Sequence, residues 1–391
     1  MARFARWFFS RLAMAAPSES PPDAALGELF AFAAAKQASA SAPPPFRILI
    51  RSSNWLGDAV MTIPAVRAIK RARPGTHITM LTPEKLADVW KLVSEVDEVI
   101  PFPAPQGRGL VRTFNGALHV FKVAALIRDR GFDAVVIFPN SLRTGLEVWL
   151  AKIPRRIGYA GHMPRRLFLN EVLPVANHSE ENPATEAPSH QVHHYLKLAE
   201  FIGARIDGDR DFGFPIANAG STPRNSSPIR IAVCAGAEYG PAKRWLPERF
   251  AEVIRNISES VECHWHLVGT AKDRPVNGEI ATLAGNLPNV ENQCGGTTLA
   301  ELVALLRRCD LLVTNDTGTM HLAALLGVRT VAIFGSTEPR LTGPLGSGHI
   351  VLRRQVECSP CFLRECPIDF RCMRAVAAAD VAAAIRTMVG K

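Results

Sequence analysis

The stretch from Ser52 to Lys70 reads SSNWLGDAVMTIPAVRAIK and directly follows a β-branched run at 47–51. An apolar strand ends here, a glycine makes the turn, and Asp58 stands where an apolar helix over 59–71 is predicted to begin. A packed turn has no need of an aspartate. Asp58 is therefore either a helix N-cap or first-turn residue, the commonest use of aspartate at such a place, or a general base aimed out of the fold.

The same alternation of strand and helix continues along the chain. The predicted strands are 47–51, 77–82, 98–102, 134–138, 156–159, 229–237, 263–269, 310–316 and 330–336. The predicted helices are 59–71, 116–130, 247–258, 273–283, 299–308, 317–326 and 380–389. Such βαβ repetition predicts an α/β protein with two doubly wound parallel sheets. We expect the last helix to fold back across the first domain.

Length and composition suggest how the domains divide. The 391 residues exceed the size at which one hydrophobic core usually stops growing, so we expect two domains. The first covers 46–206 and the second 229–391. Residues 207–228 are rich in Gly, Pro, Ser and Asn, as is typical of a connection. Residues 1–45 form an extension that is either disordered or begins with a helix lying on an anionic bilayer, because apolar side chains recur there at helical spacing: Phe4, Trp7, Phe8 and Leu12.

The net charge and the cysteines indicate the kind of partner and the cellular compartment. A formal net charge of +9 indicates an anionic partner, whether nucleic acid, an acidic membrane or a phosphorylated small molecule. No uninterrupted apolar run reaches the length of about eighteen residues that a membrane-spanning helix requires. Cys234, Cys263, Cys294 and Cys309 stand alone beside apolar runs, which is typical of reduced thiols in a cytoplasmic protein.

Three loops after predicted strands suit a phosphate group. In CAGAEYGPAKRW, from Cys234, small residues such as Gly236 let backbone N–H groups approach an anion; Glu238 lies in the same loop, and Lys243 adds a positive charge. A solvated basic turn is the alternative interpretation. IFGSTEPRLTG, from Ile333, is a weaker third loop that would close over a nucleotide or sugar.

The most specific loop is NDTGTMH, from Asn315. Asp316 forms the turn, and Thr317 and Gly318 open a helix whose first N–H groups, beside two hydroxyls, make a seat for a diphosphate. His321 either adds a hydrogen-bond donor or is structural.

Together, RSSNWLGDAVMTIPAVRAIK, GAEYGPAKRW, VTNDTGTMHLAALLG and VAIFGSTEP, in this order, resemble the ADP-heptose lipopolysaccharide heptosyltransferases of glycosyltransferase family 9, in particular the heptosyltransferase II branch. The likeness extends from about Phe46 to the C-terminus. It implies a GT-B fold, in which two Rossmann-like domains face a central cleft. It also implies transfer of L-glycero-D-manno-heptose from ADP-heptose, bound by the C-terminal domain, to the heptosyl-Kdo inner core of lipid A, bound by the N-terminal domain.

The resemblance assigns roles to individual residues. It makes Asp58 the proposed base and Lys243 a contact of the donor diphosphate. Asp316, Thr317 and Gly318 would contact donor phosphate and sugar, with His321 nearby. The chemistry agrees, because a lysine and a helix N-terminus can stabilise a departing diphosphate in place of a metal, and direct attack by the acceptor inverts the anomeric centre. We therefore expect no cofactor and no nucleic-acid partner, and a cytoplasmic enzyme peripheral to the inner membrane; the oligomeric state is left open.

Basic residues late in the first domain are candidates for binding the acidic acceptor. From this series we select Arg143, Arg155 and Arg165; a solvated basic face is the alternative. His190, His193 and His194 open a predicted helix and are candidates for its cap.

Four cysteines crowd into 358–372 with the spacing Cys-x2-Cys-x4-Cys-x5-Cys: Cys358, Cys361, Cys366 and Cys372. Thiols this close can bind zinc or an iron–sulfur cluster, and reduced thiols or a redox-sensitive pair are the alternatives. We expect the segment to lie outside the cleft, so that function does not depend on it.

Other functions fit parts of the pattern. A family member with another sugar donor or acceptor would share all four motifs. A dinucleotide-dependent oxidoreductase would suit two doubly wound domains, but the first loop lacks G-x-G-x-x-G. A non-enzymatic protein that binds lipid A or the membrane would explain the positive charge alone.

Overall fold

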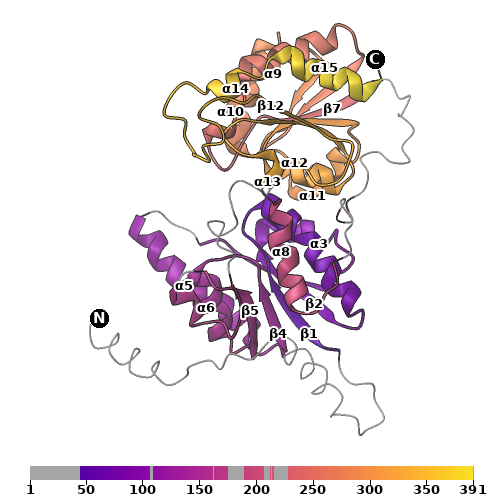
Figure 1. Ribbon diagram of the computed structural model, residues 1–391. Coiled ribbons are helices and arrows are strands. Elements are labelled where there is room, and N and C mark those ends of the chain that lie inside the picture. The colour runs from indigo at the N-terminus through magenta and orange to yellow at the C-terminus, as the bar shows by residue number, and fades with distance from the viewer. Residues whose placement is uncertain are drawn as a thin grey trace. The chain divides into compact units, whose positions relative to one another are not determined.

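Each of the two sheets in the computed structural model has six parallel strands, with helices on both of its faces (Figure 1). The structure describes residues 45–105, 109–161, 163–174, 189–206, 212, 214 and 228–390. The strand order is β3-β2-β1-β4-β5-β6 in the first sheet and β12-β11-β10-β7-β8-β9 in the second. Both orders reverse direction beside the first strand, which is the doubly wound arrangement. The predicted α/β class is confirmed.

The first half of the chain, before 207, builds the first sheet and its helices. Its elements are β1 (Arg47–Arg51), α3 (Leu56–Ala72), β2 (His77–Pro83), η2 (Glu84–Leu86), α4 (Ala87–Trp90), β3 (Glu98–Phe102), α5 (Gly109–Arg128), β4 (Ala134–Ile137), α6 (Leu142–Leu150), β5 (Arg155–Tyr159), α7 (Met163–Arg166), β6 (Glu171–Leu173) and α8 (Gln191–Phe201).

The second half, after 228, builds the second sheet. Its elements are β7 (Ile229–Cys234), η3 (Pro241–Lys243), α9 (Pro247–Ser258), β8 (Cys263–Leu267), η4 (Ala271–Asp273), α10 (Arg274–Leu283), β9 (Val290–Asn292), α11 (Leu299–Leu306), β10 (Leu311–Asn315), α12 (Gly318–Leu325), β11 (Arg329–Phe334), α13 (Pro339–Thr342), β12 (Ile350–Arg353), α14 (Arg371–Arg374) and α15 (Ala378–Val389).

Apolar side chains decide how the central strands and helices are buried. The strand β1 (RILIR) is buried along almost its whole length, because β2 and β4 flank it and helices cover both faces. On α3, a run of small and branched side chains from Ala59 to Ile69 is buried. The helix α8 packs along α3, and α12 of the second half packs on α3 as well. The loop that precedes α3 therefore lies where elements of both halves meet.

The largest hydrophobic cluster joins the two halves. It includes Val60 of α3 and Leu198 of α8 together with Leu306 of α11 and Leu322 of α12. Residues 46–391 accordingly form one compact unit by their contacts. The predicted connection at 207–228 and the extension at 1–45 fall almost wholly outside the described residues, so the domain boundaries stay predictions.

The C-terminal helix differs from expectation. We expected it to cross the first domain, but α15 packs on α9 and against β11 and β12 of the second half. Its apolar face, which includes Val381 and Ile385, completes the core of the second sheet. The apolar side chains on this face of the second sheet must be buried against another element, which explains the position of α15.

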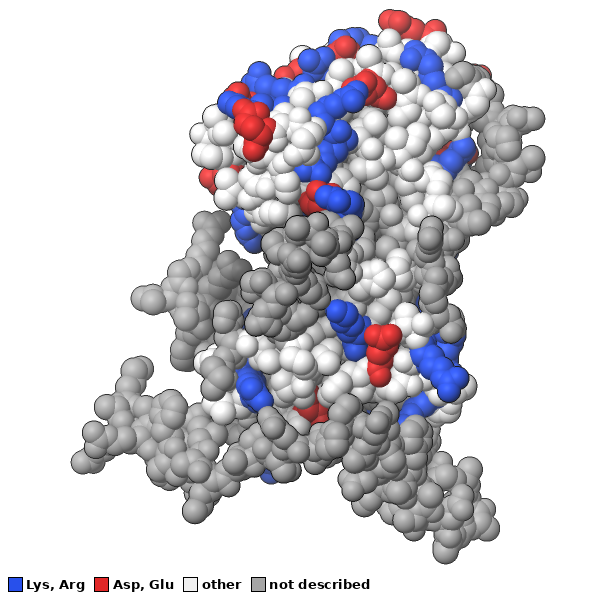
Figure 2. All heavy atoms as spheres, in the orientation of Figure 1, with Lys and Arg blue, Asp and Glu red and all other residues white. Residues whose placement is uncertain are grey.

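Two surface observations bear on the choice of partner. Among the described helices, none is long and apolar enough to cross a bilayer. On the face shown in Figure 2, basic and acidic side chains are interspersed over the second half. Ion pairs in the second half include Arg354 with Asp380 and Arg371 with Glu357.

Candidate active site

The amino ends of α3 and α12 meet at two glycines. A Cβ atom added to Gly57 would lie 2.8 Å from Cδ2 of His321, and one added to Gly318 would lie 2.7 Å from Cβ of Leu56. Side chains do not tolerate such distances, so glycine at both positions lets the two helices touch. We expected Gly57 to make the sharp turn; instead it lies inside the first turn of α3, where it permits this close approach.

Asp58 is the third residue of α3. The helix begins at Leu56, three residues before its predicted start, and Trp55 occupies the N-cap position without a side-chain hydrogen bond. Asp58 is therefore a first-turn residue and not the N-cap. Its half-buried carboxylate accepts a hydrogen bond of 3.4 Å from Nε2 of Gln191, and the hydroxyl of Tyr195 is hydrogen-bonded to it as well.

The charges around Asp58 come from the other half of the chain. Burial raises the pKa of Asp58 to about 6; the positive charge of Lys243 lowers the pKa and the negative charge of Asp316 raises it. The structure thus brings Asp58 into one site with two of the residues predicted to hold the donor. A carboxylate with a pKa near 6 is ionised at neutral pH and can take up a proton there.

Lys243 and Asp316 form a mostly buried ion pair at the carboxyl edge of the second sheet. Nζ of Lys243 lies 2.5 Å from Oδ2 of Asp316, which also accepts a 2.7 Å hydrogen bond from the hydroxyl of Thr337. The ammonium group lies over the ring of Tyr239, 4.7 Å from its centroid. Lys243 ends the short helix η3, so its stem is fixed beside the loop that follows β7.

The helix α12 begins one residue later than predicted. Thr317 is its N-cap and accepts a hydrogen bond from the backbone N–H of Met320, so Gly318 is the first helical residue. The positive end of the helix dipole consequently lies beside the Lys243–Asp316 pair. Burial lowers the pKa of His321 to about 4, which makes its imidazole neutral at physiological pH.

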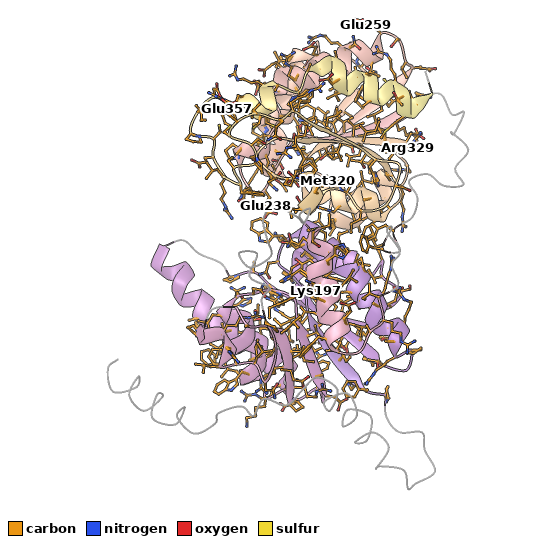
Figure 3. The ribbon with its side chains drawn as sticks, viewed as in Figure 1. Lys197, Glu238, Glu259, Met320, Arg329 and Glu357 are labelled. Carbon is orange, nitrogen blue, oxygen red and sulfur yellow. The ribbon has the colours of Figure 1, made fainter. Side chains whose placement is uncertain are left out.

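Gly236 and Glu238 have different surroundings. A Cβ atom at Gly236 would lie 2.4 Å from Oδ1 of Asp273, so this glycine makes room for a buried carboxylate. Glu238 is well exposed, and its carboxylate forms a 3.1 Å ion pair with Nζ of Lys85 in the first half. Figure 3 shows Glu238 and Met320 at the same edge of the second sheet.

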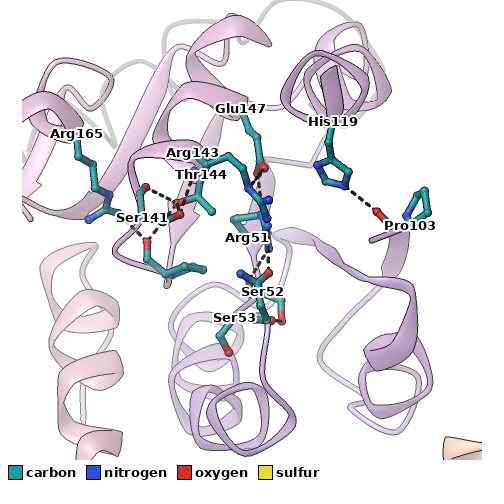
Figure 4. A network of polar contacts seen from close by, with 12 residues as sticks. Arg51, Ser52, Ser53, Pro103, His119, Ser141, Arg143, Thr144, Glu147 and Arg165 are labelled. Atoms are coloured by element: carbon teal, nitrogen blue, oxygen red, sulfur yellow. Dashed lines mark hydrogen bonds and ion pairs between the residues drawn. The ribbon is translucent and has the colours of Figure 1, made fainter. Parts of the chain in front are cut away.

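A buried polar network supports the loop that precedes α3 (Figure 4). Nε of Arg51 donates to a carboxylate oxygen of Glu147 at 3.0 Å, and both side chains are fully buried. Arg51 also donates at 3.3 Å to Oδ1 of Asn54, in the loop between β1 and α3. Arg143, a predicted acceptor contact at the start of α6, lies 3.4 Å from the other oxygen of Glu147 and is partly exposed. It remains a candidate.

The other two predicted acceptor contacts are placed elsewhere. Arg155 opens β5, at the amino edge of the parallel sheet, whereas Asp58 follows the carboxyl edge; its guanidinium pairs with Glu171. Arg165 is 1% exposed, and its guanidinium donates to the carbonyl oxygens of Tyr159 and Pro139. Neither side chain is presented to the site, so we correct the prediction for both.

Sequence reasoning missed the contribution of α8. His190 caps this helix, as one of our predictions held, because its Nδ1 accepts from the N–H of Val192 at 3.1 Å. The next residue, Gln191, and Tyr195 one turn later both reach Asp58. Their spacing of four places them on one helix face, which is the only signal in the sequence that links them.

The cysteine segment packs against one loop of the candidate site. Cys358, Cys361, Cys366 and Cys372 all line one cavity of about 200 Å³. The segment also contacts the donor loop after β7, since the hydroxyl of Tyr239 donates to the carbonyl of Phe362 and the N–H of Ala242 donates to that of Arg364. That the segment lies outside the cleft stays a prediction. Within the described part of the chain, no group of three or more His, Cys, Asp or Glu side chains is arranged to hold a metal ion.

Comparison with known proteins relates this site to a family. The model of glycosyltransferase family 9 (heptosyltransferase) matches residues 120–370. Lipooligosaccharide heptosyltransferase 2 of Campylobacter jejuni is 34% identical over 84% of this chain and 93% of its own. Lipopolysaccharide heptosyltransferase 2 of Escherichia coli is 29% identical over 78% and 88%. The solved structure of E. coli ADP-heptose lps heptosyltransferase II, 25% identical, has a TM-score of 0.67 over 88% of this chain and 98% of its own.

Proposed function

The chain belongs to glycosyltransferase family 9, and on this basis we propose that it transfers L-glycero-D-manno-heptose from ADP-heptose to the heptosyl-Kdo inner core of lipid A. The names of its relatives support this substrate class. One observation carries the proposal: Asp58 of the first half lies within electrostatic reach of Lys243 and Asp316 of the second, where α3 and α12 touch.

The residues around Asp58 support an inverting displacement. An acceptor hydroxyl oxygen attacks the anomeric carbon of the heptose, and its proton passes to the carboxylate of Asp58. The bond from the anomeric carbon to the phosphate oxygen breaks, and its electron pair leaves with ADP. Because attack and departure take place on opposite faces of the sugar, the product has the inverted configuration. Asp58 is suited to this step, because it is ionised at neutral pH and only half-buried.

The donor half would stabilise the departing diphosphate. Lys243 supplies a full positive charge, and the first turn of α12 at Gly318 adds backbone N–H groups at the positive end of the helix dipole. Asp316 holds Lys243 in place, with Thr337 as its second partner. Glu238 lies with Lys243 in the loop after β7, and we propose that it contacts the sugar or ribose hydroxyls.

We further propose that the first half meets the cytoplasmic face of the inner membrane, because the proposed acceptor carries acyl chains. Large apolar side chains are exposed on the neighbouring helices α5 and α6: Leu118, Phe121, Leu142 and Trp149. Lys122, beside Phe121, is exposed and suits an anionic bilayer surface.

Sedimentation with vesicles tests the membrane contact. We expect the protein to pellet with vesicles that contain an anionic phospholipid, and the double substitution Leu118→Ser and Phe121→Ser to reduce the bound fraction several-fold. Phe201→Ser, which removes an exposed aromatic from the end of α8, is the matched control and should leave binding unchanged. Equal binding by all three proteins would contradict the proposal.

The transferase proposal is tested by release of ADP. A coupled assay with ADP-heptose and a series of truncated cores should show turnover only with cores that end in the accepting heptose. Lys243→Ala should lower kcat by about a hundredfold, since it removes a cation from the leaving group. Turnover of another nucleotide sugar in preference to ADP-heptose would replace the substrate assignment, and a nicotinamide-dependent absorbance change would revive the oxidoreductase alternative.

A further inference from the structure

The helix α8 delivers two polar side chains to the carboxylate of Asp58. Nε2 of Gln191 lies 3.4 Å from Oδ1 of Asp58 and 3.0 Å from the hydroxyl oxygen of Tyr195, so the Gln191 amide links the two side chains. The Tyr195 hydroxyl also lowers the pKa of Asp58 as a hydrogen-bond donor, although burial outweighs it. We infer that Tyr195 and Gln191 are positioning residues that hold the base ionised and fix its orientation; the inference rests on the proposed function of Asp58.

The direction of each hydrogen bond follows from the chemistry of the groups. The Gln191 amide donates to both Asp58 and Tyr195. A phenol has a single proton, and because its oxygen accepts from Gln191, that proton is free to be donated to Asp58. The Asp58 carboxylate therefore accepts a hydrogen bond from each of the two side chains. Such a pair favours the ionised form of Asp58, which is the form that a general base needs.

The surroundings of Tyr195 leave the phenol little freedom to turn away. The side chain is 4% exposed, and its ring packs edge-on against Phe138 at a centroid distance of 5.5 Å. The α8 backbone is held along α3, the helix that carries Asp58. The pKa of Tyr195 is raised, chiefly by burial and then by the charge of Asp58, so the phenol keeps its proton.

The α8 helix also connects Asp58 to the donor half. His190, the residue before Gln191, caps the helix with Nδ1, and its Nε2 lies 3.1 Å from the carbonyl oxygen of Gly343 beyond α13. The titratable and charged groups that face Asp58 are thus Tyr195 from α8 and Lys243 and Asp316 from the donor loops. His190 and His321 interact electrostatically with each other, and burial lowers the pKa of both imidazoles.

The test compares two phenols, Tyr195 of α8 and Tyr159 of β5. Tyr195→Phe removes the hydroxyl that bonds to Asp58 and keeps the ring. Tyr159→Phe is the matched control, because the Tyr159 hydroxyl is also buried and bonds at 2.7 Å to the same helix, at the carbonyl of His194, without contact to Asp58. The measurement is the pH profile of kcat/KM for ADP release.

We expect Tyr195→Phe to move the acid limb of the profile upward by about one pH unit and to recover most of its activity at alkaline pH, since loss of a hydrogen bond to a charged group has about this effect. Gln191→Met should move the limb in the same direction by less. Tyr159→Phe should leave the limb in place. An unmoved limb in Tyr195→Phe, or a loss equal at every pH, would overturn the inference.

A second readout separates this inference from the proposed function. The carboxyl carbon of Asp58, titrated by carbon-13 NMR without substrate, should show a higher pKa in Tyr195→Phe than in the wild type. If the wild type fails to release ADP from ADP-heptose, the proposed function fails while this titration still tests the hydrogen bond. If ADP release requires Asp58 but neither the limb nor the titration moves in Tyr195→Phe, only the positioning role is lost.

Discussion

At the scale of single residues, the ionised carboxylate of Asp58 lowers the stability of the folded protein, because it is partly buried. Its pKa in the folded protein is about 6, above the 3.8 of a free side chain, because burial penalises the charge more than Lys243 and Tyr195 compensate. The folded form therefore binds the Asp58 proton more tightly than the unfolded chain does. Proton uptake by Asp58 therefore adds stability as pH falls below about 6; this contribution is complete below 3.8 and is lost as pH rises through about 6.

A stability measurement follows from this sign. Asp58→Asn should raise the free energy of unfolding at pH 8 by about 2 kcal/mol, because it removes a charge that burial disfavours. Well below pH 3.8 both proteins should be equally stable, as the carboxyl is then protonated whether folded or unfolded. Denaturant titrations at the two pH values check this. A variant less stable than the wild type at pH 8 would show that the charge is compensated by its neighbours.

The Lys243–Asp316 pair makes a second prediction at this scale. Lys243→Ala leaves the carboxylate of Asp316, 5% exposed, without its cation and should destabilise the fold by about 3 kcal/mol. Adding Asp316→Asn should restore most of that stability but no activity, because the cation for the diphosphate is still absent. Melting temperatures and ADP release of the single and double variants check this. Recovery of activity in the double variant would remove Lys243 from the donor site.

At the scale of elements, the site depends on the touching amino ends of α3 and α12. Glycine at Gly57 and Gly318 keeps Asp58 and the diphosphate seat within one site, so these glycines belong to the mechanism through packing. The sequence predicted both loops well, since each follows a buried strand and its glycine stands out. The sequence could not show that Gly57 packs against α12 and Gly318 against α3, because a contact between elements far apart in the chain leaves no periodic pattern.

Substitution at these glycines tests the contact. Gly57→Ala and Gly318→Ala should each destabilise the protein by about 1–3 kcal/mol and lower activity, since the added methyl group meets His321 or Leu56. Gly116→Ala in α5 is the control: no atom lies within 4 Å of its added Cβ, and it should stabilise the helix by up to about 1 kcal/mol. Urea midpoints of the three variants give the answer. If Gly57→Ala is as stable as the wild type, the helices do not touch as described.

What sequence reasoning missed also belongs to the level of elements. The helical pattern of α8 shows an apolar face but not which loop its polar residues reach, so Gln191 and Tyr195 escaped notice. Arg165 was wrongly predicted to bind the acceptor, because a basic residue in a basic series is typical of a solvated or ligand-binding surface. Its partners are backbone carbonyls of Tyr159 and Pro139, and carbonyl positions are set by the fold.

At the scale of the whole molecule, two sheets with the same strand order supply the two sides of one reaction. The alternation of strands and helices was enough to predict this architecture, because a parallel sheet requires a crossover helix after each strand. Nothing in the sequence of the cysteine segment indicates that its backbone supports Tyr239 and Ala242 in a donor loop. Asp58 from one half lies within electrostatic reach of Lys243 from the other, and the roles that the motifs indicated for them stay predictions.

The most direct measurement is the single-turnover rate of ADP release by the wild type and Asp58→Asn, at saturating ADP-heptose and heptosyl-Kdo acceptor, together with the donor dissociation constant of each protein. We predict a rate lower by about 10²–10⁴-fold in Asp58→Asn with an unchanged donor affinity, as loss of a general base requires. A variant that releases ADP at the wild-type rate would contradict the claim that Asp58 takes the acceptor proton.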